Sequence, residues 1–181
     1  MIFNKTKLDG VYTIDLEKYE DDRGFFARSW DVKKFKENKL KSELVQCNIS
    51  FSKKRGTLRG MHYQSTPYEE AKLVWCPKGS IYDVVIDLRP KSKTFKKWIS
   101  FEINDKNYLM VYVPEGFAHG FITLEDNTVV HYQMSEAFRP EYSQGVLWND
   151  STFKIKWPIK PSIISKRDNS FLPFNIRDKN K

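Results

Sequence analysis

The sequence predicts an all-β fold, a sandwich or barrel, and three observations predict it. Several short runs alternate with the period of two that a strand requires. Pro and Gly separate these runs in PKG, LRP, VPEG and FRP, and only one run carries clear helix signals. The chain has 181 residues, of which 40% are hydrophobic and 15% aromatic. That length and composition predict one globular domain spanning residues 1–181.

The elements follow in chain order. The segment GVYTIDL is short, rich in β-forming residues and opened by glycine, so it predicts a first strand. In LVQCNIS, Gln46 and Asn48 share one face, with Cys47 and Ile49 on the other. Asp31 is a plausible N-cap for the one predicted helix, and a second short helix is expected near the C-terminal end. The predicted strands cover residues 10–16, 44–50, 80–89, 108–113 and 128–134, and the helix covers 31–38.

The three later strands differ in pattern. In residues 80–89, four apolar side chains face one way, and Asp83 and Asp87 face the other. Residues 108–113 are nearly all apolar, which is typical of a strand buried on both faces. In residues 128–134, Tyr132 shares its face with two apolar side chains and His131 lies opposite.

The formal net charge is +8, but the lysines are scattered through turn-like segments. A solvated surface explains them, and part of this charge could serve an anionic substrate. A nucleic-acid-binding barrel would interleave aromatic and basic residues on one open face. The sequence has no such stripe, so no nucleic-acid partner is expected.

Three features of the sequence bear on the cellular compartment. The two cysteines have no spacing motif, the first ten residues do not resemble a signal peptide, and no apolar run is long enough to span a membrane. We expect a cytoplasmic protein without a membrane partner.

The stretch LRGMHYQ places Arg59 close to His62. A lone histidine is commonly a core residue bonded to a carbonyl, but arginine is rarely buried without an anion. Lys72, at the start of KLVWC, is an ordinary edge charge unless it points inward beside His62. Tyr132 is either a packed phenol or an acid, because a pKa near ~10 lets it donate a proton to a carbanion. Asp168 is a surface carboxylate unless it contacts His62, where it would fix the ring tautomer.

The segment VPEGFAHGF, with Pro114, Gly116 and His119, resembles the second motif of the cupin superfamily, whose fold is a small jelly-roll barrel. Metal-dependent cupins carry two further histidines and a glutamate in their first motif. The corresponding stretch here, MHYQSTPYEE, has only one histidine, and the whole chain has three. A stable metal site needs three or four ligands, so no metal is expected.

Eight segments in order resemble the dTDP-4-dehydrorhamnose 3,5-epimerase family over nearly the whole chain. These segments are DDRGFF, QCNIS, TLRGMHYQ, KLVWCPKGSIYDVVIDLRPKSKTFKKW, VPEGFAHGF, LWND, IKWP and SKRD. The resemblance implies a cupin-type jelly-roll barrel with a few short peripheral helices. It also implies a homodimeric isomerase that needs no cofactor. The implied substrate is a nucleotide-diphospho-sugar whose sugar is a 4-keto-6-deoxy-sugar, on the route to dTDP-L-rhamnose.

The resemblance also assigns roles to residues. His62 is the base, Asp168 its orienting partner, Tyr132 the acid on the opposite face, and Lys72 the group that steadies the enolate. The substrate and its phosphates are assigned to Arg59, His119 and Arg167. Nucleotide binding is assigned to Arg23, Gln46 and Asn48, with Arg23 reaching over from a partner subunit.

Three positions depart from the family. Arg28 replaces an acid at the nucleotide end, Ser143 replaces a second acid, and Phe138 replaces a common tyrosine. The first two predict a nucleotide preference that is not strictly dTDP, and Phe138 predicts inversion at one carbon. The alternatives are therefore a single-centre (C3 or C5) epimerase or a ketoisomerase on another nucleotide sugar. An alternative from another class of function is a cupin that binds a sugar nucleotide without catalysis.

Overall fold

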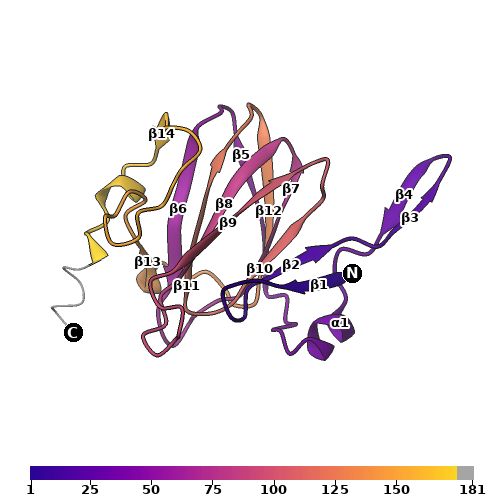
Figure 1. The fold of residues 1–181 in the computed structure, drawn as a ribbon, viewed down its shortest axis with the longest axis horizontal. Coiled ribbons are helices and arrows are strands. Elements are labelled where there is room, and N and C mark those ends of the chain that lie inside the picture. Colours follow the sequence, from indigo (N-terminus) through magenta and orange to yellow (C-terminus); the bar gives the residue numbers. More distant parts are fainter. Residues whose placement is uncertain (175–181) are drawn as a thin grey trace.

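The computed structural model describes residues 1–174, which form two antiparallel sheets packed against each other (Figure 1). The first sheet has the order β1-β2-β10-β7-β12-β5, and the second has the order β13-β6-β11-β8-β9. The short β14 adds to the second sheet by pairing in parallel with β6. The predicted all-β, cupin-type fold is confirmed.

All five predicted strands are present, with ends that shift by a few residues. The first sheet contains β1 (Ile2–Lys5), β2 (Tyr12–Asp15), β5 (Gln46–Ser52), β7 (Lys72–Lys78), β10 (Met110–Val113) and β12 (Thr128–Met134). The second contains β6 (Thr57–Gln64), β8 (Ser80–Asp87), β9 (Trp98–Asn104), β11 (Phe117–Thr123), β13 (Ser143–Gly145) and β14 (Ile163–Ile164). A separate hairpin is formed by β3 (Lys18–Asp21) and β4 (Gly24–Ala27).

The predicted helix is α1 (Val32–Glu37), and Asp31 is its N-cap. The Asp31 carboxylate accepts hydrogen bonds from the backbone N–H groups of Lys33 and Lys34, which the first turn leaves unpaired. Two short 3₁₀ helices, Pro140–Tyr142 and Asp168–Ser170, follow later in the chain. The second of them agrees with the short helix expected near the C-terminal end.

Apolar side chains form three clusters, one between the sheets and one outside each sheet. The central cluster contains residues from both sheets, such as Val74 on β7 and Val85 on β8. Phe35 of α1 packs over the outer face of the first sheet. Phe153 and Phe174 cover the outer face of the second sheet. Each sheet therefore has apolar side chains packed on both of its faces.

Strand β5 has its polar face inward and its apolar face outward. Ser50 and Ser52 are buried, whereas Ile49 and Phe51 on the alternate positions are 72% and 49% exposed. An edge strand with this orientation supplies polar groups to the barrel interior and leaves an apolar strip on the surface.

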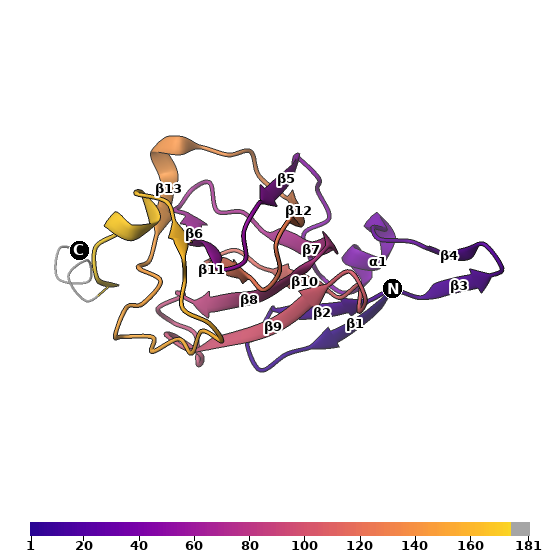
Figure 2. The same ribbon diagram turned by 90° about the horizontal axis from the view of Figure 1, so that it is seen from above.

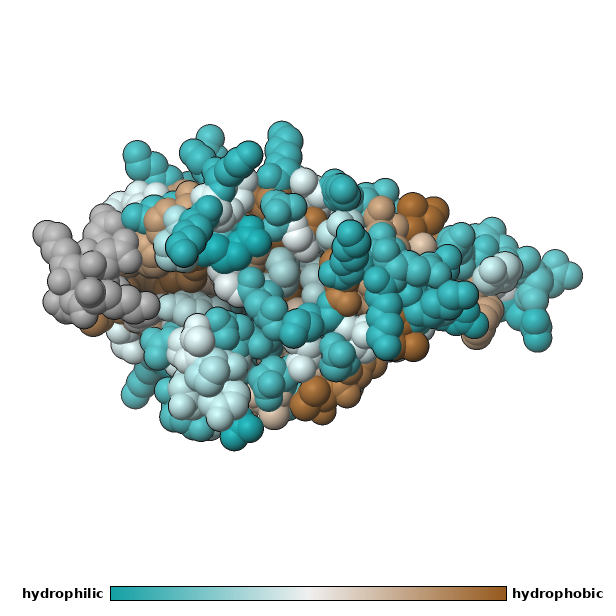
Figure 3. Space-filling view, turned by 90° about the horizontal axis from the view of Figure 1, so that it is seen from below, coloured by the Kyte–Doolittle hydropathy of each residue, from teal (hydrophilic) through white to brown (hydrophobic). Residues whose placement is uncertain are grey.

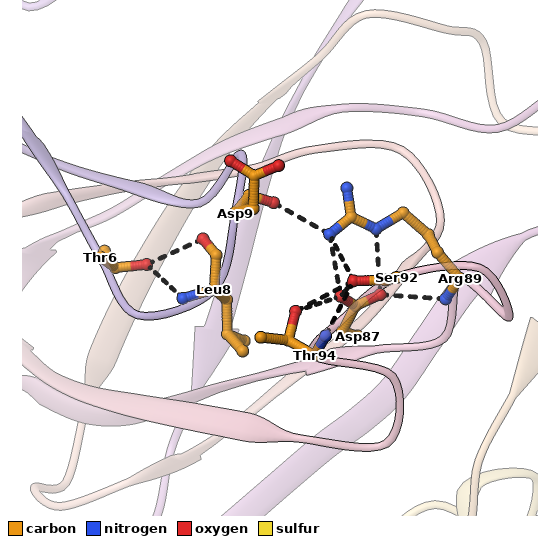
Figure 4. Close-up of polar contacts among 7 residues, drawn as sticks. All are labelled: Thr6, Leu8, Asp9, Asp87, Arg89, Ser92 and Thr94. Carbon is orange, nitrogen blue, oxygen red and sulfur yellow. Dashed lines mark hydrogen bonds and ion pairs between the residues drawn. The ribbon is translucent and has the colours of Figure 1, made fainter.

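A buried polar cluster joins the end of β8 to the N-terminal loop (Figure 4). The fully buried Asp87 carboxylate accepts hydrogen bonds from Arg89, Ser92 and Thr94. Arg89 also donates to the backbone oxygen of Asp9, whose own carboxylate points away from the cluster. Asp87 lies opposite Phe117 in the ladder between β8 and β11, so the cluster fixes one end of both strands.

The β3–β4 hairpin extends away from the two sheets (Figure 2). Seen from below, the surface is mainly hydrophilic, in keeping with the number of lysines (Figure 3). Among the described residues, no helix is long and apolar enough to cross a membrane.

Candidate active site

A cavity of about 280 Å³ opens between the sheets and is lined from both of them. Nine of the twelve predicted site residues line it: Gln46, Asn48, Arg59, His62, Lys72, His119, Tyr132, Phe138 and Arg167. Asp168 lies directly behind His62 as its hydrogen-bond partner. Arg23 and Arg28 are not part of the lining.

His62 and Asp168 form a hydrogen-bonded pair, with 2.7 Å between His62 Nε2 and Asp168 Oδ1. Burial would raise the pKa of Asp168, but the hydrogen bonds from His62 and from the backbone N–H of Gly60 hold the pKa below its ordinary value. An ionised Asp168 accepts the Nε2 proton and leaves the lone pair on His62 Nδ1. This is the tautomer that a general base needs.

Gly60 allows Arg59 and His62 to reach the same cavity although they are three residues apart. Its φ of +136° is disfavoured for other residues, and a Cβ there would lie 2.5 Å from Gly120 Cα. The pairing of β6 with β11 shifts register at this point, from His62 opposite His119 to Arg59 opposite Phe121. The irregularity breaks the alternation of side chains, so Arg59 and His62 both reach the cavity.

Tyr132 comes from β12 in the first sheet, whereas His62 comes from β6 in the second. The two side chains therefore approach the cavity from opposing sheets. Burial raises the pKa of Tyr132, and the positive charge of Arg59 opposes that rise only in part. The phenol therefore keeps its proton at neutral pH and is available as an acid.

Lys72 points inward, so it is not an edge charge. Its Nζ lies 2.7 Å from Glu70 Oε1, and both side chains are buried. Glu70 also accepts a hydrogen bond from the backbone N–H of Gln64 on β6. Sequence reasoning did not include Glu70, but a signal was available: it precedes Lys72 by two residues, which places both on one face of an extended segment.

His119 has a partner that was also not predicted. Its Nε2 lies 2.6 Å from Oδ1 of the fully buried Asp83. Asp83 stood out in the sequence as a carboxylate in an otherwise apolar strand pattern, and that was the available signal. Buried carboxylates usually have a charged or hydrogen-bonding partner nearby.

The remaining polar side chains hold one another at the rim. Arg167 donates to the Ser143 hydroxyl at 2.6 Å, so the residue that replaces the family acid positions an arginine. Arg59 donates to the backbone oxygen of Phe51 at 3.0 Å. Gln46 donates to Asn48 and accepts from the backbone N–H of Phe138.

Arg23 and Arg28 lie on or beside the hairpin, away from the cavity of their own chain. Arg23 pairs with Asp21 and Arg28 pairs with Asp31, and both arginine side chains are mostly exposed. Within one chain, neither arginine reaches the cavity. The assignment of both residues to nucleotide binding stays a prediction.

The described residues contain no group of three or more His, Cys, Asp or Glu side chains that could hold a metal ion. His131 lies on the opposite face of β12 from Tyr132, as predicted, and its Nδ1 accepts a hydrogen bond from Trp75. The cavity therefore offers acid–base side chains and cations, and its predicted independence from metal remains to be tested.

Together, the barrel and a cavity with a His–Asp pair, a tyrosine and a lysine define an acid–base isomerase of the cupin type. Residues 5–175 match the family model described as dTDP-4-dehydrorhamnose 3,5-epimerase. The chain belongs to the dTDP-4-dehydrorhamnose 3,5-epimerase family, and it is a carbohydrate epimerase by class. The predicted family and enzyme class are confirmed.

Relatives agree in sequence and structure. A dTDP-4-dehydrorhamnose 3,5-epimerase of Methanothermobacter thermautotrophicus is 41% identical over 174 residues, covering 94% of this chain and 93% of the relative. The crystal structure of that enzyme from Elizabethkingia anophelis has a TM-score of 0.94 and 40% identity, and the match covers 100% and 99% of the two chains. A Legionella pneumophila dTDP-6-deoxy-D-glucose-3,5-epimerase in complex with dTDP-4-keto-L-rhamnose has a TM-score of 0.92 and 31% identity, covering 99% and 95%.

Proposed function

We propose that this protein inverts C3 and C5 of dTDP-4-dehydro-6-deoxyglucose, without a cofactor, in the synthesis of a rhamnose-like deoxysugar. The observation that carries the proposal is the placement of the His62–Asp168 pair and Tyr132 on opposing sheets around one cavity. Inversion needs a base on one face of the sugar and an acid on the other. The names of the relatives support the substrate.

The chemistry follows from the ketone at C4, which acidifies the hydrogens on C3 and C5. His62 removes a proton, and imidazole is the side chain that most often serves as a general base near neutral pH. Negative charge develops on the C4 oxygen, where the ammonium of Lys72 stabilises it. Tyr132 then donates a proton from the opposite face. Asp168 orients His62 and stabilises its protonated form.

The rest of the cavity would hold the nucleotide. Arg59, His119 and Arg167 bind the substrate and its diphosphate, since arginine matches phosphate oxygens in two-point contacts. The amides of Gln46 and Asn48 would contact the base.

A homodimer would complete this site. The outer face of β5 and the two residues before the strand expose four apolar side chains that a second copy would cover: Leu44, Val45, Ile49 and Phe51. The projecting hairpin would carry Arg23 and Arg28 to the cavity of the neighbouring chain. We also place the protein in the cytoplasm, where its sugar-nucleotide substrate would be found.

The comparisons favour this proposal over the alternatives raised by Arg28, Ser143 and Phe138. The relatives described above are named 3,5-epimerases of dTDP sugars. A cavity that served binding alone would not need an acid and a base from opposing sheets.

The test follows exchange of the sugar hydrogens in heavy water. Incubation with dTDP-4-dehydro-6-deoxyglucose should bring deuterium into both C3 and C5, detected by NMR. His62→Ala should abolish exchange at both carbons, whereas Tyr132→Phe should permit exchange and block net inversion, because proton removal and return use different groups. Absence of label with the unaltered protein refutes the proposal, and label at one carbon alone identifies a single-centre epimerase.

A further inference from the structure

The Asp83–His119 pair holds a carboxylate that is not fully satisfied. Asp83 is fully buried, and its Oδ2 atom has no hydrogen-bond partner in residues 1–174. Its Oδ1 atom lies 2.6 Å from His119 Nε2. An ionised Asp83 therefore fixes the Nε2 proton of His119, and Nδ1 is the polar ring atom left for a ligand. His119 lines the cavity, so that ligand would be the substrate.

The formal charges at the cavity cancel when both histidines are neutral. Three cations, Arg59, Lys72 and Arg167, line it. Three carboxylates balance them, because Glu70 lines the cavity and Asp83 and Asp168 pair with its two histidines.

A nucleotide sugar brings its diphosphate into this balanced site, with one negative charge on each esterified phosphate. Within one chain, the lining has no surplus cation to neutralise that charge. Arginines supplied by a neighbouring copy would add positive charge, but they are always protonated and would take up no proton. Those arginines leave the ring of His119 as it is: Nε2 donates to Asp83 and Nδ1 carries a lone pair, so His119 can donate a hydrogen bond to an anion only after it takes up a proton.

We infer that binding of a nucleotide-diphospho-sugar draws one proton from solvent onto the Asp83–His119 pair, making His119 an imidazolium between Asp83 and the bound anion. The inference rests on the proposed function and adds a charge state to it. Before binding, Nδ1 of His119 has a lone pair; afterwards its N–H donates to the anion, and Nε2–H continues to donate to Asp83. Asp83 is thus a positioning residue that keeps a protonated histidine in the cavity.

The other histidines are less suited to this proton. His62 must remain unprotonated to act as the base in the proposed reaction. His131 accepts a hydrogen bond from Trp75 on the other face of β12, and burial lowers its pKa.

The charged and titratable groups around His119 come from several elements. Those that share its cavity or contact it are Arg59, His62, Tyr63, Glu70, Lys72, Asp83, Tyr132 and Arg167, with Asp168 directly behind His62. Glu70 is committed to Lys72, and the arginines already carry their protons and cannot accept another, so the uptake falls to the histidines.

The experiment is calorimetric titration with dTDP-glucose in buffers of different ionisation enthalpy at one pH. This ligand lacks the 4-keto group and does not react, and its diphosphate diester does not titrate near neutral pH, so any proton taken up belongs to the protein. We expect uptake approaching one proton per site. With rising pH, the dissociation constant should increase by up to about tenfold per pH unit.

Variants assign the proton to one of the three histidines. His119→Gln and Asp83→Asn should lose most of the uptake, whereas His62→Gln and His131→Gln should retain it. NMR of histidine-labelled wild-type protein gives the same answer without a substitution: only the His119 ring should change to the imidazolium state on addition of dTDP-glucose. This readout keeps the inference testable if Asp83→Asn fails to fold.

The outcomes separate the two claims. Binding without proton uptake, or uptake that disappears in His62→Gln and persists in His119→Gln, overturns the inference and leaves the epimerase proposal intact. Failure of dTDP-glucose to bind at all overturns the inference, and the heavy-water exchange assay decides the epimerase proposal separately. Uptake that depends on His119 supports the inference.

Discussion

The Asp87 cluster allows a quantitative prediction about stability. Burial would raise the pKa of Asp87, but hydrogen bonds from Arg89, Ser92 and Thr94 lower it from 3.8 to about 2. Each pH unit of displacement corresponds to about 1.4 kcal/mol. The ionised carboxylate therefore contributes about 2 kcal/mol to the free energy of unfolding.

The direction of the pH dependence follows from that lowered pKa. The contribution is fully present above the unfolded value of 3.8 and is lost as the pH falls through about 2. Asp87→Asn removes the charge and turns an amide N–H₂ toward other donors. We expect it to lower the free energy of unfolding by at least about 2 kcal/mol at pH 7, equivalent to roughly 4–8 °C in melting temperature.

The assay is urea denaturation followed by tryptophan fluorescence at pH 7 and pH 3, at one protein concentration. The stability difference between wild type and Asp87→Asn should shrink to about half at pH 3. Asp9→Asn is the matched control, since the hydrogen bond from Arg89 goes to the backbone oxygen of Asp9 and the Asp9 carboxylate points away from the cluster. Equal losses in the two variants, or a difference that does not change with pH, would refute this account of the cluster.

Three further predictions concern the site and the assembly. Exhaustive chelation should leave activity unchanged, and a loss restored by one divalent metal would contradict the cofactor-free proposal. Light scattering at micromolar concentration should show a dimer, and Ile49→Asp on the exposed β5 face should shift it to monomer while Ile163→Asp on β14 does not. Gly60→Ala should destabilise the fold by about 1–3 kcal/mol and lower activity, because its Cβ would lie 2.5 Å from Gly120 Cα; normal exchange of the substrate hydrogens by this variant would contradict the role of the glycine.

The sequence was most informative where periodicity and capping act locally. The five predicted strands and the helix capped by Asp31 are all present, because alternation and an N-cap are properties of neighbouring residues. The predicted strands leave out β1, the β3–β4 hairpin, β6, β7, β9, β11, β13 and β14. The burial patterns of β1, β3, β4 and β9 are mostly exposed or mixed, so hydropathy gives them little signal, whereas β11 is buried throughout and shows no alternation.

The site was partly predictable for a similar reason. His62, Lys72 and Tyr132 stood out from apolar surroundings, and the structure brings them to one cavity. Asp168 could be linked to His62 only through the family resemblance, since 106 residues separate them. Glu70 and Asp83 were missed because their importance depends on which cation faces them, and pairing across strands determines that.

The position of Asp168 in the chain has a consequence for protein synthesis. Every strand of both sheets precedes it in the sequence, whereas His62 lies in β6. As the chain leaves the ribosome, the barrel strands and most of the cavity emerge before the carboxylate that fixes the His62 tautomer. A nascent barrel would therefore form most of its cavity before it has the means to exchange protons, because Arg167, the last residue of the cavity lining, emerges one residue ahead of that carboxylate.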